Sequence, residues 1–200
     1  MQESQFPVHQ YCDPWNIPLE ARLAALVKGR VHIAYFCEEQ NNSSFRYRAY
    51  NMAQVLNECT DDISASYFFL NDLHEIENIV DSADLVVVCR ARYCHRLANL
   101  IQRFKAKGKP VLFDVDDLVF DTRYVHLIVK TLGLNTTDTG IWDWWFAYIS
   151  RISEAMRLCD RIITTNDFLA KKAEEFHAVP AKIVPNFMNK EQLNISDAIF

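Results

Sequence analysis

Three carboxylates stand within four residues at the end of one apolar run. In the segment 109–121, a short run that fits a buried strand is followed by Asp114, Asp116 and Asp117. Packing alone seldom calls for so much charge at the end of a core strand, because an ionised carboxylate is costly to remove from water. In an open α/β sheet, ligands bind at the carboxyl ends of the strands. We therefore interpret this segment as the rim of a binding site.

The three aspartates permit three kinds of chemistry. Their oxygens could bind a divalent metal such as magnesium or manganese. They could act as acid or base groups, or accept hydrogen bonds from sugar hydroxyls, or they could simply cap a following helix. Alternation along the strand predicts Asp114 and Asp116 on one face and Asp117 on the other. Repulsion within a close pair would raise the pKa of one member.

The loop after the first expected strand carries the second set of candidate residues. It spans residues 38–48 and contains no glycine, so it has neither the G-x-G-x-x-G fingerprint of dinucleotide sites nor a Walker A loop. It offers Ser43 and Ser44 at a helix start, followed by Arg46 and Arg48. Backbone N–H groups at a helix N-terminus, reinforced by guanidinium groups, suit a phosphate or a carboxylate. Taken alone, the loop fits a capped helix with two solvated arginines better.

Strand-like and helix-like segments alternate from residue 30 onward, and these elements must position the candidate residues. Apolar runs predict six strands, at 31–37, 64–70, 85–89, within 109–121, at 161–165 and at 181–185. Helical spacing is found at 19–27, 45–58, 72–80, 93–107, 121–134, 141–159 and 168–177, the last capped by Asn166 and Asp167. Strands separated by helices imply parallel βαβ units with right-handed crossovers. We predict an α/β, Rossmann-like parallel sheet with helices on both faces.

The composition favours one cytoplasmic domain. Half of the 200 residues are hydrophobic, and a net charge of −5 argues against non-specific binding to nucleic acid. The six cysteines are scattered without a C-x-x-C pair, so we interpret them as reduced thiols and expect no zinc site. The amino terminus lacks a signal-peptide core, and no apolar run approaches the ~20 residues that span a bilayer.

A dense aromatic group lies in the predicted helix 141–159. It consists of Trp142, Trp144, Trp145 and Phe146. We expect these rings to fill a core between helix and sheet. The alternative is that they line an acceptor groove or rest at a membrane interface.

Three stretches together resemble the amino-terminal half of GT-B glycosyltransferases of the large, group 1 (family 4-like) class. Residues 44–51, S-F-R-Y-R-A-Y-N, are similar to the S-x-R-Y-R-x-Y-N start of the first helix in one branch of that family. Residues 113–121, F-D-V-D-D-L-V-F-D, resemble the F/Y-D-x-D-D-x-x-F-D stretch of the same branch. Residues 160–166 and 182–186 resemble the D-x-V-I-x-x-S and V-I-P-N-G-V-D ending of the amino-terminal domain. The resemblance spans about 30–189, and the order and spacing of the stretches carry it.

The resemblance implies an acceptor-side domain at 30–189, preceded by an extension at 1–29 and followed by a linker or tail at 190–200. By matching positions, Asp116 would contact the transferred sugar or the acceptor, supported by Asp114 and Asp117 as catalytic candidates. Ser43, Ser44, Arg46 and Arg48 would approach the donor diphosphate. The family commonly works without a bound metal, so we expect neither a metal nor a cofactor, with the nucleotide-sugar as co-substrate. The acceptor would be a glycan or a lipid-linked glycan in polysaccharide or glycoconjugate synthesis.

The chain departs from the family pattern at two places, and it has no counterpart of the family's donor-domain residues. The Gly-Gly pair common in the first loop is absent, and P-N-G-V-D reads Pro185-Asn186-Phe187-Met188-Asn189. The lysine, arginine and paired glutamates of the donor domain have no counterpart here. We therefore expect that a missing donor domain or a partner chain completes the enzyme. We expect no transmembrane segment, and peripheral contact with a membrane is compatible with a lipid-linked acceptor. The alternatives are a non-catalytic Rossmann-like module that binds a sugar, a nucleotide or a protein, and a metal-dependent phosphotransfer or hydrolase domain using Asp114 and Asp116.

Overall fold

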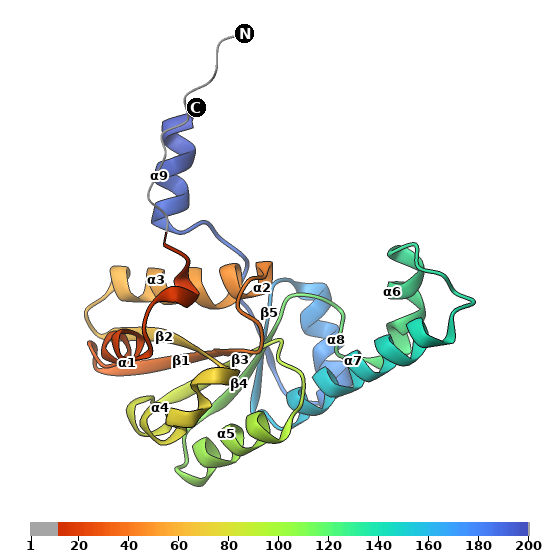
Figure 1. Cartoon of the computed structure of the whole chain (residues 1–200), viewed down its shortest axis with the longest axis horizontal. Helices are drawn as coiled ribbons and strands as arrows, with labels where there is room; N and C mark the ends of the chain where they lie inside the picture. Colours follow the sequence, from red (N-terminus) through yellow and green to blue (C-terminus); the bar gives the residue numbers. More distant parts are fainter. Residues whose placement is uncertain (1–11, 200) are drawn as a thin grey trace.

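The computed structural model describes residues 12–199, and within them six strands form one parallel sheet (Figure 1). In chain order they are β1 Val31–Cys37, β2 Ile63–Phe69, β3 Leu85–Cys89, β4 Val111–Val115, β5 Arg161–Thr164 and β6 Ala181–Ile183. In space they follow the order β2-β1-β3-β4-β5-β6, and every neighbouring pair is parallel. The predicted α/β, Rossmann-like fold is confirmed. Residues 1–11 of the predicted extension lie outside the described part of the chain.

Helical segments connect each strand to the next, as βαβ units require. The first connection is one continuous helical segment, built from α2 Ser43–Phe45, the π-helical turn η2 Arg46–Tyr50 and α3 Asn51–Cys59. The later connections are η3 Leu70–Glu75 with α4 Ile76–Ser82, then α5 His95–Ala106, then η4 Thr122–Tyr124 with α6 Val125–Thr131 and α7 Thr139–Arg157, and finally α8 Asp167–His177. A short turn η1 Pro14–Asn16 and helix α1 Leu19–Leu26 precede β1. The segment 190–200, which we assigned to a linker or tail, is helical over α9 Lys190–Ile199.

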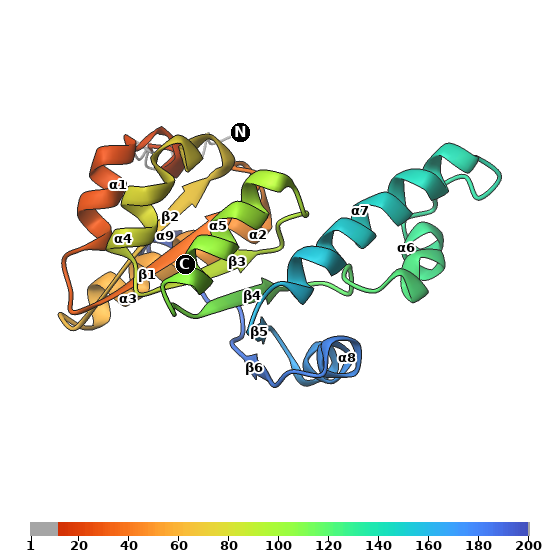
Figure 2. The ribbon, with the colours of Figure 1, turned by 90° about the horizontal axis from the view of Figure 1, so that it is seen from below.

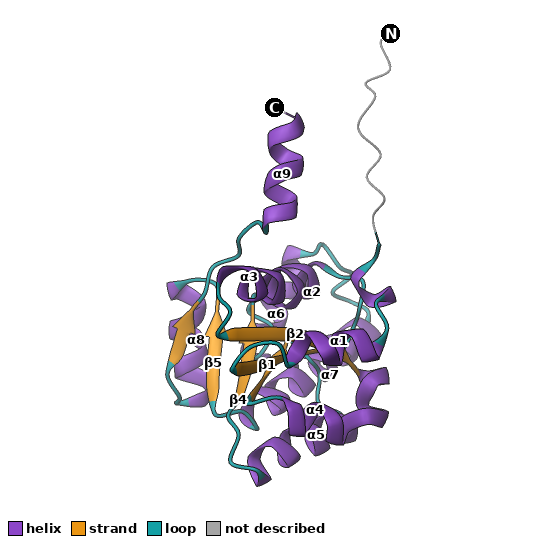
Figure 3. Cartoon of the chain, turned by 90° about the vertical axis from the view of Figure 1, so that its left-hand side faces the viewer, coloured by secondary structure: helices purple, strands orange, loops and turns teal. Residues whose placement is uncertain are grey.

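Hydrophobic side chains pack on both faces of the sheet, because successive strand residues point to opposite sides. Phe36 and its neighbours join a large cluster that includes α1, α4, α5 and the inner side of α7. Tyr35 faces the other way and joins a smaller cluster with Phe45, Ala49 and Met52 of the helical segment 43–59. Figure 3 shows the sheet between α3 on one side and α4 and α5 on the other. The two layers hold the carboxyl ends of β1, β3 and β4 in fixed relation.

Strand β4 ends earlier than the alternation argument assumed. The strand stops at Val115, and the chain then turns, with the Val119 N–H donating to the Asp117 carbonyl at 2.9 Å. The prediction that pleating sets the directions of Asp116 and Asp117 is therefore wrong, because neither residue lies in the strand. The loop after β4 sets their directions instead.

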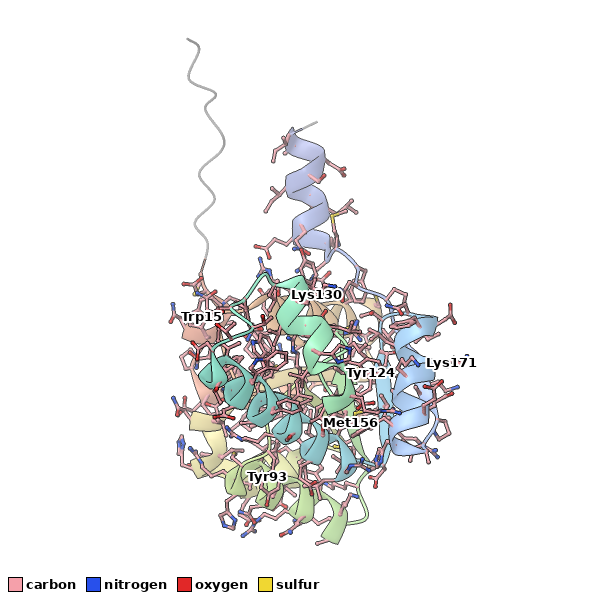
Figure 4. All side chains as sticks on the ribbon, turned by 90° about the vertical axis from the view of Figure 1, so that its right-hand side faces the viewer. Trp15, Tyr93, Tyr124, Lys130, Met156 and Lys171 are labelled. Atoms are coloured by element: carbon pink, nitrogen blue, oxygen red, sulfur yellow. The ribbon has the colours of Figure 1, made fainter. Side chains whose placement is uncertain are left out.

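Helices α6 and α7 extend away from the sheet as an arm (Figure 2). In Figure 4 the arm faces the viewer, with Lys130 labelled on α6 and Met156 on the inner part of α7. Only the later part of α7 packs fully on the core, through Ile149, Ile152, Ala155 and Met156. The early part of α7 therefore presents side chains beyond the edge of the sheet.

Candidate functional site

A polar cavity lies where the strand order reverses. Strand β2 lies on one side of β1 and β3 on the other, so the crossovers diverge between β1 and β3. In open α/β sheets this switch point, at the carboxyl ends of the strands, is where ligands bind. The cavity has a volume of about 250 Å³ and is lined by Cys37, Glu38, Glu39, Asn42, Ser43, Ser44, Phe45, Cys89, Arg90 and Tyr148. It therefore draws on the ends of both strands, the first loop and α7.

Ser44, Arg90 and two of the predicted aspartates form one hydrogen-bonded network at this cavity. The Ser44 hydroxyl donates to Asp116 Oδ2 at 2.9 Å. Arg90 Nη1 donates to Ser44 Oγ and to Asp116 Oδ1, each at 3.3 Å, and to Asp117 Oδ2 at 2.5 Å. Asp116 is not itself a lining residue, and it reaches the cavity through Ser44 and Arg90. Its carboxylate therefore orients two side chains that do line the cavity.

Arg90 holds an unusual backbone conformation directly after β3. Its φ is +44°, in the left-handed region that non-glycine residues seldom adopt. Burial alone would lower the pKa of Arg90, but Tyr148, Asp116 and Asp117 outweigh it and raise the pKa, so the guanidinium stays charged. Such strained residues cluster at functional sites. Sequence reasoning missed Arg90, although its place directly after an apolar strand is the same signal that singled out the aspartates after β4.

Arg48 and Asp114, two further predicted site residues, pair with each other inside the protein. Their side chains are 1% and 2% exposed. Arg48 Nε donates to Asp114 Oδ1 and Nη2 to Oδ2, both at 2.8 Å. Burial raises the pKa of Asp114 to about 6, although the hydrogen bonds and the charge of Arg48 act to lower it. This pair lies behind the cavity and joins the helical segment 43–59 to β4.

The remaining predicted residues flank the start of the first helix. The side-chain oxygen Oδ1 of Asn42 accepts a hydrogen bond from the Phe45 N–H at 2.7 Å and caps the helix. The first turn of this helix carries Ser43 and Ser44. Arg46 lies on the other side of this turn and stacks on Tyr50, with its Cζ 5.0 Å from the ring centroid. Arg46 lines a second cavity of about 410 Å³ together with Trp15 and Tyr47. The two cavities share Asn42, Ser43 and Phe45, so the helix start separates them.

The Cys89 thiol, which lines the first cavity, is unsuited to nucleophilic attack. Cys37 and Cys89 are register partners in β1 and β3, and both are buried. Burial, with Cys37 alongside, raises the pKa of the Cys89 thiol well above its usual range. A thiol must ionise to act as a nucleophile. The six cysteines of the chain, all among the described residues, form no disulfide in the structure.

The acidic wall of the cavity is built on an ion pair. Glu38 Oε1 and Oε2 accept from Arg92 Nε at 2.9 and 2.8 Å. These hydrogen bonds raise the pKa of Arg92. Glu39 also accepts from Arg92, at 3.0 Å, while its side chain stays 62% exposed. Neither glutamate was singled out from the sequence, where they read only as part of a polar loop.

The aromatic group of α7 divides between core and surface. Trp142 and Trp145 pack against the large hydrophobic cluster, but Trp144 is 53% exposed and Phe146 45%. The expectation that the whole group fills the core is therefore wrong for these two rings. Trp142 and Trp145 share one side of α7 with the buried residues Ile149 and Ile152, at helical spacing, whereas Trp144 and Phe146 lie off that side. Tyr148, one turn after Trp144, lines the first cavity.

With this geometry defined, the chain can be compared with known proteins. Protein-family models, curated proteins and solved structures give no match to it. The Rossmann-like parallel α/β fold therefore stands on the structure itself. Among residues 12–199, no three His, Cys, Asp or Glu side chains lie close enough together to hold one metal ion. None of the described helices combines the length and the apolar character needed to cross a bilayer.

Proposed function

We propose that this chain is the acceptor-side domain of a GT-B glycosyltransferase, which transfers a sugar from a nucleotide-sugar to a glycan or a lipid-linked glycan. The observation that carries the proposal is the charged, polar cavity at the switch point between β1 and β3. Its wall combines a helix start at Ser43 and Ser44, the guanidinium of Arg90 and the carboxylates of Glu38 and Glu39, the second of them exposed. Anionic phosphate and neutral sugar hydroxyls are the two kinds of group that such a wall recognises.

The helix start and Arg90 would bind the donor diphosphate. Backbone N–H groups at a helix N-terminus point outward and favour anions, and a guanidinium adds charge-assisted hydrogen bonds. Arg90 is already held by Asp116 and Asp117, so little conformational freedom is lost when a phosphate binds. The Ser44 hydroxyl already donates its proton to Asp116 and accepts from Arg90, so its remaining lone pair would accept one hydrogen bond from a sugar hydroxyl. That Asp116 itself touches the transferred sugar stays a prediction.

The other half of the cleft would come from elsewhere. The described residues form one parallel sheet, and the proposed enzyme needs a second Rossmann-like unit for the nucleotide. We propose that a further domain or a partner chain supplies it. We also propose that the enzyme works in the cytoplasm, with no nucleic acid partner, and reaches lipid-linked acceptors by peripheral membrane contact.

Ligand-detected NMR tests this proposal on the chain as it is. Saturation transfer is measured with UDP-glucose, GDP-mannose and dTDP-glucose as three separate probes. We expect at least one to bind. Binding should be about tenfold weaker for Arg90→Ala, which removes a charge-assisted hydrogen bond, and for Ser44→Ala, which removes an acceptor for a sugar hydroxyl and a hydrogen-bond partner of Arg90. Asp143→Asn, an exposed carboxylate on α7 away from the network, serves as the control and should bind like the parent. The proposal fails if none of the probes binds, or if Ser44→Ala and Arg90→Ala bind as tightly as Asp143→Asn.

A non-catalytic binding module is the second candidate, and one observation favours it. Both oxygens of Asp116 are already engaged, by Ser44 and by Arg90, so this carboxylate has its protein partners in place without a substrate. A sugar-nucleotide or sugar would then be bound and not turned over. Release of nucleoside diphosphate from a nucleotide-sugar in the presence of an acceptor, lost on Asp116→Asn, would exclude this alternative.

A further inference from the structure

A fixed aromatic surface continues outward from the cavity along α7. Tyr148 lines the cavity and stacks on Trp144, with ring centroids 5.1 Å apart and an interplanar angle of 17°. Trp145 meets the same two rings edge-on, at 4.8 Å from Trp144 and 5.6 Å from Tyr148. Trp144 nevertheless remains 53% exposed. A flat ring face is therefore presented to solvent directly beside a polar cavity.

The stack is held in place from behind by charged groups. The Arg92 guanidinium lies over the Tyr148 ring, with its Cζ 5.3 Å from the centroid. Arg92 is itself fixed by its two hydrogen bonds to Glu38. Glu38, Arg92, Tyr148 and Trp144 thus form one connected series that orients the outer indole before any ligand arrives. Such preorganisation reduces the conformational entropy lost on binding.

The chemistry around Trp144 selects the kind of ligand. Apolar ring surface gains free energy when a ligand removes it from water, and Trp144 offers such surface within a fixed stack. Two exposed carboxylates belong to the cavity that Tyr148 lines. Glu39, 62% exposed, is a lining residue, and Asp117, 59% exposed, pairs with the lining residue Arg90; each has lone pairs beyond those used by its arginine. A pyranose ring presents C–H groups on one face, which pack on an aromatic ring, and hydroxyls at its edge, which donate to carboxylates. Ionised carboxylates only accept hydrogen bonds, so they favour the hydroxyls of a sugar over the phosphodiester oxygens of a membrane surface, which are acceptors as well.

We infer that the Trp144 indole, backed by Tyr148, forms a stacking platform for one pyranose ring of the acceptor glycan, with Asp117 and Glu39 as acceptors for its hydroxyls. The assignment of this pyranose ring to the acceptor rests on the proposed function, in which the cavity binds the donor diphosphate. The platform itself is a sugar site by its own chemistry. It extends the ligand-binding surface from the switch point onto the arm.

Saturation-transfer NMR with simple sugars tests the platform without any nucleotide. The probes are the methyl glycosides of glucose, galactose, mannose and N-acetylglucosamine, in both anomeric forms. We expect at least one to bind, with the strongest saturation on its ring C–H protons. Trp144→Ala should weaken binding by about tenfold, which corresponds to the loss of one aromatic contact. Trp144→Tyr, which keeps a flat ring, should retain most of the affinity.

Phe146→Ala is the matched control, since Phe146 is also an exposed ring of α7 but has no place in the stack. It should bind the glycosides like the parent, and circular dichroism should show all three variants folded. The platform is overturned if no glycoside binds, or if Trp144→Ala binds as tightly as Phe146→Ala. A membrane site would replace the platform if the chain binds no glycoside but floats with anionic phospholipid vesicles, and if this flotation is lost in Trp144→Ala and Phe146→Ala.

The two proposals fail separately. The glycoside probes carry no phosphate, so their binding does not depend on Ser44 or on the helix start. Loss of glycoside binding with nucleotide-sugar binding intact removes the platform alone. Glycoside binding that depends on Trp144, without binding of any nucleotide-sugar, removes the proposed function and leaves a sugar-binding module.

Discussion

Arg48 and Asp114 meet in two parallel hydrogen bonds of 2.8 Å, one from Nε and one from Nη2, inside the protein. Arg48 Nη1 also donates to the Val184 carbonyl at 2.7 Å and to Asn186 Oδ1 at 3.1 Å. One guanidinium therefore joins three segments that are far apart in the chain: the helical segment 43–59, β4 and the stretch after β6. This arrangement fixes the helix start that carries Ser44 against the strand end that carries Asp116.

Removing the acceptor of this pair should destabilise the fold strongly. Asp114→Ala leaves the Arg48 charge buried without its partner, and we expect the free energy of unfolding to fall by about 3–5 kcal/mol. Arg48→Lys keeps the charge but not the two-point geometry, and should fall between this variant and the parent. Urea denaturation measures both. The exposed pair of Arg30 and Asp62 provides the control, because Asp62→Ala should have little effect. A loss for Asp114→Ala no larger than that of Asp62→Ala would contradict the role given to the pair.

The backbone at Arg90 should favour glycine once the guanidinium is gone. Arg90→Ala and Arg90→Gly both remove the contacts to Asp116 and Asp117, but only alanine keeps a Cβ at φ +44°. Because the left-handed region disfavours a Cβ, we expect Arg90→Gly to be more stable than Arg90→Ala by about 1 kcal/mol. Thermal or urea unfolding of the two variants compares them directly. Equal stabilities, or a more stable alanine variant, would show that the backbone there is not strained.

Asp121 should contribute stability that depends on pH. Burial alone would raise its pKa, but the hydrogen bonds from Arg123 outweigh burial and lower the pKa. A folded pKa below the unfolded one means that the unfolded chain binds more protons, so stability rises with pH through this window. The contribution is complete above the unfolded pKa of about 4 and is lost as the pH falls through the folded pKa.

The corresponding variant is Asp121→Asn. We expect it to lower the free energy of unfolding by roughly 1–2 kcal/mol at neutral pH, and by much less at about pH 3. Urea unfolding at the two pH values gives the difference, and the exposed Asp143→Asn should change stability at neither. A loss at Asp121 that stays constant between the two pH values would remove the charge-based explanation.

Asn189 should control how firmly α9 is attached. Its side chain is buried, and its Nδ2 donates to Asn51 Oδ1 at 3.1 Å and also to Gln54. Its Oδ1 accepts from the Gln192 N–H at 2.8 Å and caps the helix. Asn189→Ala removes both the tether and the cap, so the amides of α9 should exchange with deuterium about tenfold faster, while those of the sheet keep their protection.

Hydrogen exchange measured by mass spectrometry reports α9 and the sheet separately. Asn194→Ala, an exposed position on the same helix, is the matched control and should leave the exchange of α9 nearly unchanged. If the amides of α9 exchange at the same rate in Asn189→Ala and Asn194→Ala, the polar contacts from Asn189 to α3 do not hold α9.

Local patterns were sufficient wherever one element's own side chains decide its structure. The strands β1 and β3 have the predicted bounds, because each is an apolar run that only a buried strand accommodates. The predicted cap of α8 is present, with Asn166 Oδ1 accepting from the Leu169 N–H at 3.0 Å. The aromatic rings of α7 show the limit of such reasoning. They were expected to fill the core as one group, but only the side of α7 that packs on the core decides which rings are covered.

The sequence by itself determined the parallel α/β sheet and the gathering of polar residues at the carboxyl ends of its strands, since period and composition are local properties of the chain. Only the tertiary structure decided what those residues do. It placed Arg48 against Asp114, 66 positions away, and so withdrew two predicted site residues into the interior, while it brought Arg90 and Tyr148 to the cavity. The reason is physical: an ion pair or a stack depends on the depth and direction of side chains from distant segments, and these are set by how the elements pack.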